Sequence, residues 1–142
     1  MPLPLDEREA FLAEPHIGAL AVARAQPGRA PLTVPIWYWY EPGGAFWFMT
    51  GRDSAKAKAI RAAGRISLMV ERLDPTVRYV TVEGPVTSEV TSTVQELTDL
   101  AARYLPADKV EGYVKAATAE HGAQVTFHIS PEHWLSADLG SV

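Results

Sequence analysis

Alternating apolar and polar positions predict six short strands in this chain. The runs are rich in β-branched and aromatic residues, and Pro, Gly and Asp clusters typical of turns separate them. They span residues 17–25, 31–40, 45–50, 66–71, 78–89 and 124–130. Gly84 and Pro85 interrupt the fifth run, which predicts a bulge or an edge position there.

Helix signals fill the remaining segments, at residues 6–13, 55–63, 93–104 and 108–119. Ser54 can cap the second helix and Gly64 can end it, while Thr93 and Glu96 form a capping box before the third. The strands and interposed helices together predict a mostly β fold with flanking helices, arranged as an antiparallel barrel with helices at its rim.

Composition narrows the class of protein. With 142 residues, of which 47% are apolar, the chain suits one globular domain over residues 1–142. A net charge of -4 disfavours nucleic-acid binding, and the absence of cysteine excludes thiolate chemistry and suits a reducing compartment. No apolar stretch is long enough for a membrane span. We therefore expect a cytoplasmic protein without a membrane or nucleic-acid partner.

Side chains for metal binding or hydrolysis are poorly arranged. The four histidines lie in different predicted elements, without a His-x-x-x-His pair, so we expect no metal site. No serine lies in a nucleophile-elbow motif, which removes the common hydrolytic triads.

A basic segment stands out in this acidic chain. Within residues 52–65 only Asp53 is acidic, while the segment carries five cations: Arg52, Lys56, Lys58, Arg61 and Arg65. A cation in the first turn of a helix opposes the helix dipole, at a cost of about 0.3–1 kcal/mol when exposed. A bound anion turns this cost into a favourable interaction, because it attracts both the cation and the helix N-terminus. Ser54, the first-turn amides and Lys56 can therefore form a phosphate cradle. A solvated helix face is the alternative interpretation.

The aromatic run at residues 34–40 is the second candidate. Strand alternation places Pro35, Trp37 and Trp39 on one face, and Ile36, Tyr38 and Tyr40 on the other. Such a strand is either buried on both faces or faces a ligand, and core or subunit packing is the commoner reason. Because Pro35 cannot donate to a ladder, the strand is expected at an edge or interrupted, with backbone groups left for a planar ligand.

Five motifs in this order resemble the pyridoxamine 5′-phosphate oxidase-like split-barrel flavoproteins. They lie at residues 34–38, 48–50, 54–58, 66–68 and 79–84, and the likeness spans about residues 11–86 with a weaker match at the last predicted strand. The resemblance implies a six-stranded antiparallel split β-barrel. It also implies a homodimer that holds FMN or the deazaflavin coenzyme F-420 in a groove between the subunits.

The resemblance also implies site residues. Arg52, Ser54, Lys56 and Lys58 look like the phosphate-binding set. Two strand segments would border the ring system, with Pro35, Ile36, Trp37 and Tyr38 in the first and Met49 and Thr50 in the second. Arg78 and Tyr79 would reach the cofactor of the neighbouring subunit.

The implied activity is hydride transfer between the cofactor and a small conjugated molecule, without an assignable catalytic side chain. The Ser-x-Lys-x-Lys and Pro-x-Trp patterns resemble the deazaflavin branch, which favours coenzyme F-420 over FMN, and Arg52, Arg61 and Arg65 could extend a basic track for an acidic tail. The basic C-terminal signature of the vitamin B6 enzymes has no counterpart in residues 133–138. A non-catalytic flavin- or heme-binding module, an FMN-dependent pyridoxamine-phosphate-oxidase-like enzyme and a dimeric interaction domain are the alternatives.

Overall fold

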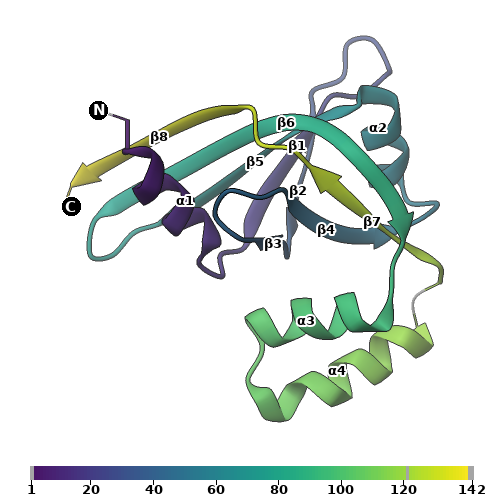
Figure 1. The fold of residues 1–142 in the computed structure, drawn as a ribbon. Coiled ribbons are helices and arrows are strands. Elements are labelled where there is room, and N and C mark those ends of the chain that lie inside the picture. Colours follow the sequence, from purple (N-terminus) through teal and green to yellow (C-terminus); the bar gives the residue numbers. More distant parts are fainter. Residues whose placement is uncertain (1, 121, 141–142) are drawn as a thin grey trace.

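The computed structural model describes residues 2–120 and 122–140, which form a curled sheet with helices around it (Figure 1). The helices of this described part are α1 (Leu5–Ala13), α2 (Ala55–Ala63), α3 (Val94–Tyr104) and α4 (Ala107–Glu120). Its strands are β1 (Gly18–Val22), β2 (Leu32–Ile36), β3 (Trp39–Tyr40), β4 (Phe46–Gly51), β5 (Arg65–Arg72), β6 (Val77–Thr91), β7 (Gln124–Ile129) and β8 (His133–Gly140). None of these helices is long and apolar enough to cross a membrane.

The strands form one antiparallel sheet in the order β2-β1-β5-β6-β7-β4-β3, with β8 paired to β6 off this path. The 15-residue strand β6 joins the two halves, because its first part pairs with β5 and β8 and its last part pairs with β7. This long, bent strand lets the sheet curl into an open barrel (Figure 1). The predicted class, a mostly β split barrel with flanking helices, is confirmed.

The predicted number of six strands is wrong, since the described residues form eight. The run at 31–40 splits into β2 and β3, and β2 lies at the sheet edge, as Pro35 predicted. Strand β8 was not predicted because two of its apolar residues are exposed and a polar residue is buried, which inverts the usual pattern. Leu135 and Leu139 are 63% and 65% exposed, whereas Ser136 is buried.

Gly84 lies in β6 close to an irregularity of its pairing. The pairing of β6 with β7 shifts register between Val86 and Ser88, which confirms the predicted irregularity. A Cβ at residue 84 would lie 1.8 Å from the carbonyl oxygen of Ser130, so only glycine fits where the chain passes between β7 and β8. Ser130 N donates to Pro85 O at 3.1 Å and tightens this approach.

The core lies inside the curl of the sheet and is largely aromatic. Its largest fully buried side chains include Tyr38, Tyr40, Phe46, Phe48 and Phe127. The helices α1 and α2 pack against this core, whereas the α3–α4 hairpin projects from one end of the barrel (Figure 1). The hairpin is therefore placed to wall off space beside the sheet rather than to cover its core.

Local signals set both ends of α2 and the start of α3 as predicted. The Ser54 side chain caps α2 by accepting from Ala57 N at 3.0 Å, and Gly64 ends the helix with a φ of 71°. Thr93 and Glu96 form the predicted capping box at α3. These caps define where α2 and α3 begin, and both helices contribute residues to the cavity beside the sheet.

Candidate functional site

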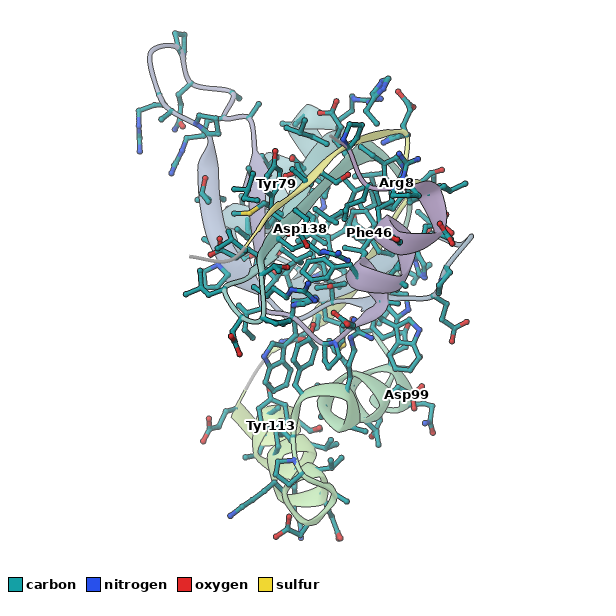
Figure 2. All side chains as sticks on the ribbon, turned by 90° about the vertical axis from the view of Figure 1, so that its left-hand side faces the viewer. Arg8, Phe46, Tyr79, Asp99, Tyr113 and Asp138 are labelled. Carbon is teal, nitrogen blue, oxygen red and sulfur yellow. The ribbon has the colours of Figure 1, made fainter. Side chains whose placement is uncertain are left out.

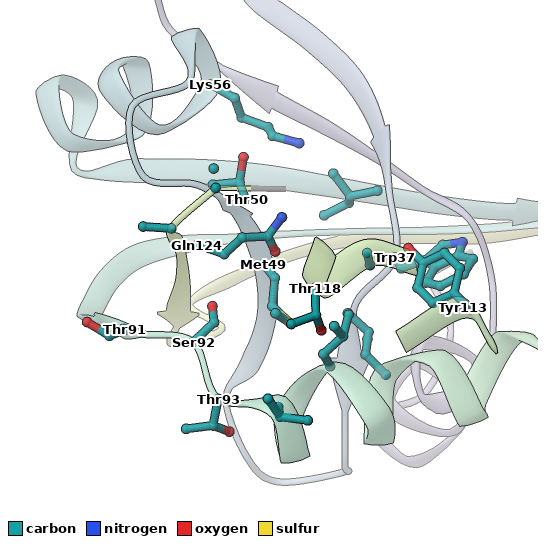
Figure 3. Close-up of a pocket in the computed structure, with 18 of the residues that line it drawn as sticks. Trp37, Met49, Thr50, Lys56, Thr91, Ser92, Thr93, Tyr113, Thr118 and Gln124 are labelled. Carbon is teal, nitrogen blue, oxygen red and sulfur yellow. The ribbon is translucent and has the colours of Figure 1, made fainter. Parts of the chain in front are cut away.

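A cavity of about 550 Å³ lies where the α3–α4 hairpin meets the barrel (Figure 3). Its walls come from the ends of β2 and β4, the first turn of α2, the inner side of the hairpin and the start of β7. The lining residues that carry the following argument are Trp37, Met49, Thr50, Lys56, Tyr113 and Gln124. A volume in this range suits a cofactor or small-molecule ligand.

Lys56 supplies the cation of the cavity. Its side chain extends from the first turn of α2 into the cavity above Thr50 (Figure 3). No carboxylate of the described residues forms a salt bridge with it, and partial burial lowers its pKa because desolvation disfavours the charged form. An anion bound in the cavity would offset both this desolvation and the unfavourable helix dipole.

Two hydroxyl groups connect α2 to the cavity wall. Thr50 lines the cavity near the end of β4, and its Oγ1 lies 3.2 Å from Ser54 Oγ. Ser54 Oγ in turn accepts the amide of Ala57, so it is engaged as the helix cap. The first turn of α2, which carries Lys56, is thereby held against the end of β4.

An aromatic wall lies away from Lys56 in the cavity. The Trp37 ring stacks on Tyr104, with centroids 4.9 Å apart and planes 8° apart, and it contacts Tyr113 at 5.2 Å. Trp37 and Tyr113 both line the cavity and lie close together in Figure 3. A cationic end and an aromatic wall in one cavity can accommodate a planar ring that carries an anionic group.

The structure brings half of the predicted cofactor-binding residues to this one cavity: Pro35, Ile36, Trp37, Met49, Thr50 and Lys56. They come from three segments far apart in the sequence. Arg52 and Lys58 are exposed and do not line the cavity, and Arg52 lies 3.8 Å from Asp53.

Tyr38 lies elsewhere than expected. Its side chain is buried in the core and not in the cavity wall, and its hydroxyl donates to Leu12 O at 2.6 Å. Burial raises its pKa above the ordinary tyrosine value. Its backbone N–H and C=O both contact the Tyr104 hydroxyl at 3.1 Å, so they are not free for a ligand. Tyr38, which was expected to border the ring system, therefore does not line the cavity.

Arg78 and Tyr79 are neighbours in β6. Figure 2 shows Tyr79 away from the hairpin that carries Tyr113. Arg78 Nε donates to Asp138 Oδ2 at 2.9 Å. Hydrogen bonds from the Thr76 hydroxyl and the Gly140 amide, followed by Arg78, lower the pKa of Asp138 to about 2. The two residues do not line the cavity of their own chain, and their contact with a neighbouring subunit's cofactor stays a prediction.

Two arginines of the basic segment pair with carboxylates that are distant in the sequence. Arg61 Nη2 lies 2.7 Å from Glu89 Oε2, and Arg65 Nη2 lies 3.0 Å from Glu132 Oε1. The predicted continuous basic track therefore divides, and Lys56 is the member of the segment that faces the cavity.

Sequence reasoning missed the hairpin wall. Its members come from both helices and from the chain that flanks them: Thr91, Ser92, Thr93, Val94, Leu97, Leu100, Tyr113, Ala117, Thr118, Gly122, Ala123 and Gln124. The helical spacing of Leu97 and Leu100 correctly predicted an amphipathic helix. It carried no information about which part of the sheet that helix faces.

Comparisons with known proteins agree with this architecture. A solved F-420 reductase is 25% identical, covers 89% of this chain and 94% of its own, and has a TM-score of 0.69. A conserved hypothetical protein from Mycobacterium tuberculosis is 24% identical, covers 96% of this chain and 85% of its own, and has a TM-score of 0.71. HutZ, a heme storage protein from Vibrio cholerae, shares the fold at 14% identity and a TM-score of 0.63, over 99% of this chain and 98% of its own.

A search among proteins of curated function finds no match. Among residues 2–120 and 122–140, no group of His, Cys, Asp and Glu is arranged to hold a metal ion. The model of the family described as pyridoxamine 5′-phosphate oxidase matches residues 5–137, which is nearly the whole chain. The chain belongs to this family and has its split-barrel flavoprotein fold.

Proposed function

We propose that this protein is an oxidoreductase that binds a flavin or deazaflavin in the cavity and transfers a hydride between it and a small conjugated molecule. Coenzyme F-420 is favoured over FMN. The observation that carries the proposal is Lys56, a partly buried cation with no carboxylate partner among the described residues, which faces a cavity with an aromatic wall.

The phosphate group of either cofactor fits the Lys56 end. An ammonium group and a phosphate form a charge-assisted hydrogen bond, and the first-turn amides of α2 add partial positive charge on the same side. Thr50 lies beside Lys56 in the wall and offers a hydroxyl group. Cofactor binding therefore relieves an electrostatic cost that the unbound protein carries.

The ring system fits the aromatic end. A bound flavin or deazaflavin supplies the hydride chemistry itself, and the protein contributes position and exclusion of water. Trp37 and Met49 give the apolar wall on the barrel side, and Leu97 and Leu100 give it on the hairpin side. Tyr113 is the one tyrosine of the described residues that lines the cavity, so its hydroxyl or a water molecule would deliver a proton.

A second copy of the chain is the proposed partner. The pairings align Pro35, Ala19, Met69, Thr81 and Leu135 in one uncharged row on the outer face of the sheet. Leu135 is 63% exposed at one end of the row, and Pro35 lines the cavity at the other. A second copy seated on this row would border the cavity, as the family resemblance implies.

We expect light scattering coupled to size exclusion to give twice the mass of the chain. Thr81→Glu places a charge at the centre of the row and should shift the protein toward the monomer. Gln26→Glu adds the same charge to an exposed loop and should leave the mass unchanged. A monomeric wild type, or the same effect from both variants, would refute a dimer through this face.

The cofactor is tested by equilibrium titration of the apoprotein with FMN and, separately, with coenzyme F-420, followed by fluorescence. We expect saturable binding of at least one cofactor, tighter for coenzyme F-420, and reduction or oxidation of the bound cofactor by a conjugated acceptor or donor. Binding without turnover would favour a carrier instead of an enzyme. Absence of binding in both titrations would overturn the proposal. A heme titration followed by absorbance would then test the alternative of a heme-binding module.

A further inference from the structure

The strand run breaks between β2 and β3, where Trp37 and Tyr38 belong to neither strand. A break in a strand leaves backbone groups without ladder partners, and such groups are costly when buried. Here one side chain from another part of the fold supplies hydrogen bonds to the backbone of Tyr38. It is Tyr104, the last residue of α3, which lies 66 residues further along the chain.

The Tyr104 hydroxyl engages both backbone groups of Tyr38. The Tyr38 N–H donates to Tyr104 Oη at 3.1 Å. The single hydroxyl proton is directed toward two carbonyl oxygens, that of His16 at 2.7 Å and that of Tyr38 at 3.1 Å. The strand break is thus fastened to both α3 and the segment before β1.

The ring of the same tyrosine supports Trp37. The two rings are stacked, 4.9 Å between centroids and 8° between planes. Trp37 lines the cavity, whereas Tyr104 does not. Tyr104 therefore contacts a cavity wall from behind, through both the ring of residue 37 and the backbone of residue 38.

The end of α3 is itself rigidly attached. Arg103 donates through Nη1 to Ala13 O at 2.7 Å and through Nη2 to Glu14 O at 2.8 Å. These bonds join α3 to the C-terminal end of α1. The support behind Trp37 is consequently part of the barrel framework and not a loose helix end.

We propose that Tyr104 is a positioning residue for the cofactor cavity: its hydroxyl replaces the ladder hydrogen bonds at the β2–β3 break, and its ring fixes the orientation of Trp37. The role in cofactor binding rests on the proposed function. A wall held in its binding orientation lowers the ordering cost of association, which corresponds to about two- to tenfold in affinity for one side chain.

Tyr104→Phe tests this role because it keeps the stacked ring and removes only the hydroxyl. Tyr113→Phe is the matched variant: it removes a hydroxyl from the other tyrosine beside Trp37, and no hydrogen bond of that hydroxyl occurs among the described residues. Hydrogen exchange of the Tyr38 amide and the indole N–H signal of Trp37, both measured by NMR on the apoprotein, report the break directly. We expect faster Tyr38 exchange and a shifted Trp37 signal in Tyr104→Phe, and unchanged Tyr38 exchange in Tyr113→Phe.

Titration with FMN and coenzyme F-420 then connects position to binding. Introduced alone, Tyr104→Phe should raise the Kd about two- to tenfold. Introduced into the Trp37→Leu variant, it should raise the Kd less, because its effect on binding passes through Trp37. Unchanged Tyr38 exchange, or equal effects in both backgrounds, would overturn the positioning role. A wild type that binds neither cofactor would contradict the proposed function, and the two NMR readouts would still decide whether Tyr104 fixes Trp37.

Discussion

Lys56→Ala should weaken FMN or coenzyme F-420 binding by about 10- to 150-fold, the equivalent of roughly 1.5–3 kcal/mol for a hydrogen bond to a charged group. The ammonium is the cation that lines the cavity, and it has no carboxylate partner among the described residues. Fluorescence titration of wild type and variant measures the effect.

The same substitution should stabilise the apoprotein. Removal of a cation from the first turn of α2 relieves its conflict with the helix dipole, which is worth about 0.3–1 kcal/mol. Denaturant unfolding of the cofactor-free protein gives this quantity. Opposite signs for affinity and stability are expected where a residue is retained for binding at a cost in stability.

Lys109→Ala is the matched control for Lys56→Ala. Lys109 also lies in the first turn of a helix, α4, but it is exposed and does not line the cavity. Its removal should change the affinity by less than about twofold, because exposed charges are screened. Equal losses of cofactor affinity in both variants would indicate that the net charge of the protein, and not a contact with Lys56, sets the affinity. An unchanged Kd in Lys56→Ala would contradict the assignment of Lys56 to the phosphate.

Gly84→Ala should lower the free energy of unfolding by about 3 kcal/mol, at the upper end of the usual cost of overpacking. The new Cβ would lie 1.8 Å from Ser130 O and 2.9 Å from Ser130 C. Both are backbone atoms at the crossing between β7 and β8, so no side-chain rotation can relieve the contact. Urea denaturation followed by circular dichroism measures the change.

Gly112→Ala is the comparison for Gly84→Ala. Gly112 lies within α4, and a Cβ there meets no atom within 4 Å. Alanine should raise stability by about 0.4–1 kcal/mol, because it reduces the freedom of the unfolded chain in a helical position. A neutral Gly84→Ala beside a stabilising Gly112→Ala would show that the crossing at Ser130 is looser than described.

Short-range chemistry explains what could be predicted from the sequence. Ser54, Gly64 and Thr93 set helix ends through atoms a few residues away, and all three act as expected. Pro35 lacks an N–H, and β2 lies at the sheet edge as that predicts. The strand β8 was missed because exposed Leu135 and Leu139 invert the usual pattern of burial.

The candidate site was predictable only in part. Alternation placed Trp37 and Tyr38 on opposite faces of their strand, but it could not show that Trp37 faces the cavity and Tyr38 the core. That choice depends on the hairpin, since Tyr104 on α3 bonds the backbone of Tyr38 and stacks on Trp37. Nothing within several residues of position 37 encodes this contact.

The sequence by itself determined the helix and strand runs, the cap of α2 and a lysine whose charge opposes the helix dipole. The tertiary structure decided which cations of the basic segment stay available to bind an anion. Arg61 and Arg65 meet carboxylates 28 and 67 residues away, whereas Lys56 faces a cavity that the hairpin walls on one side. The physical reason is range: caps and alternation act between near neighbours in the chain, while pairing of charges and closure of a cavity depend on segments that only folding brings together.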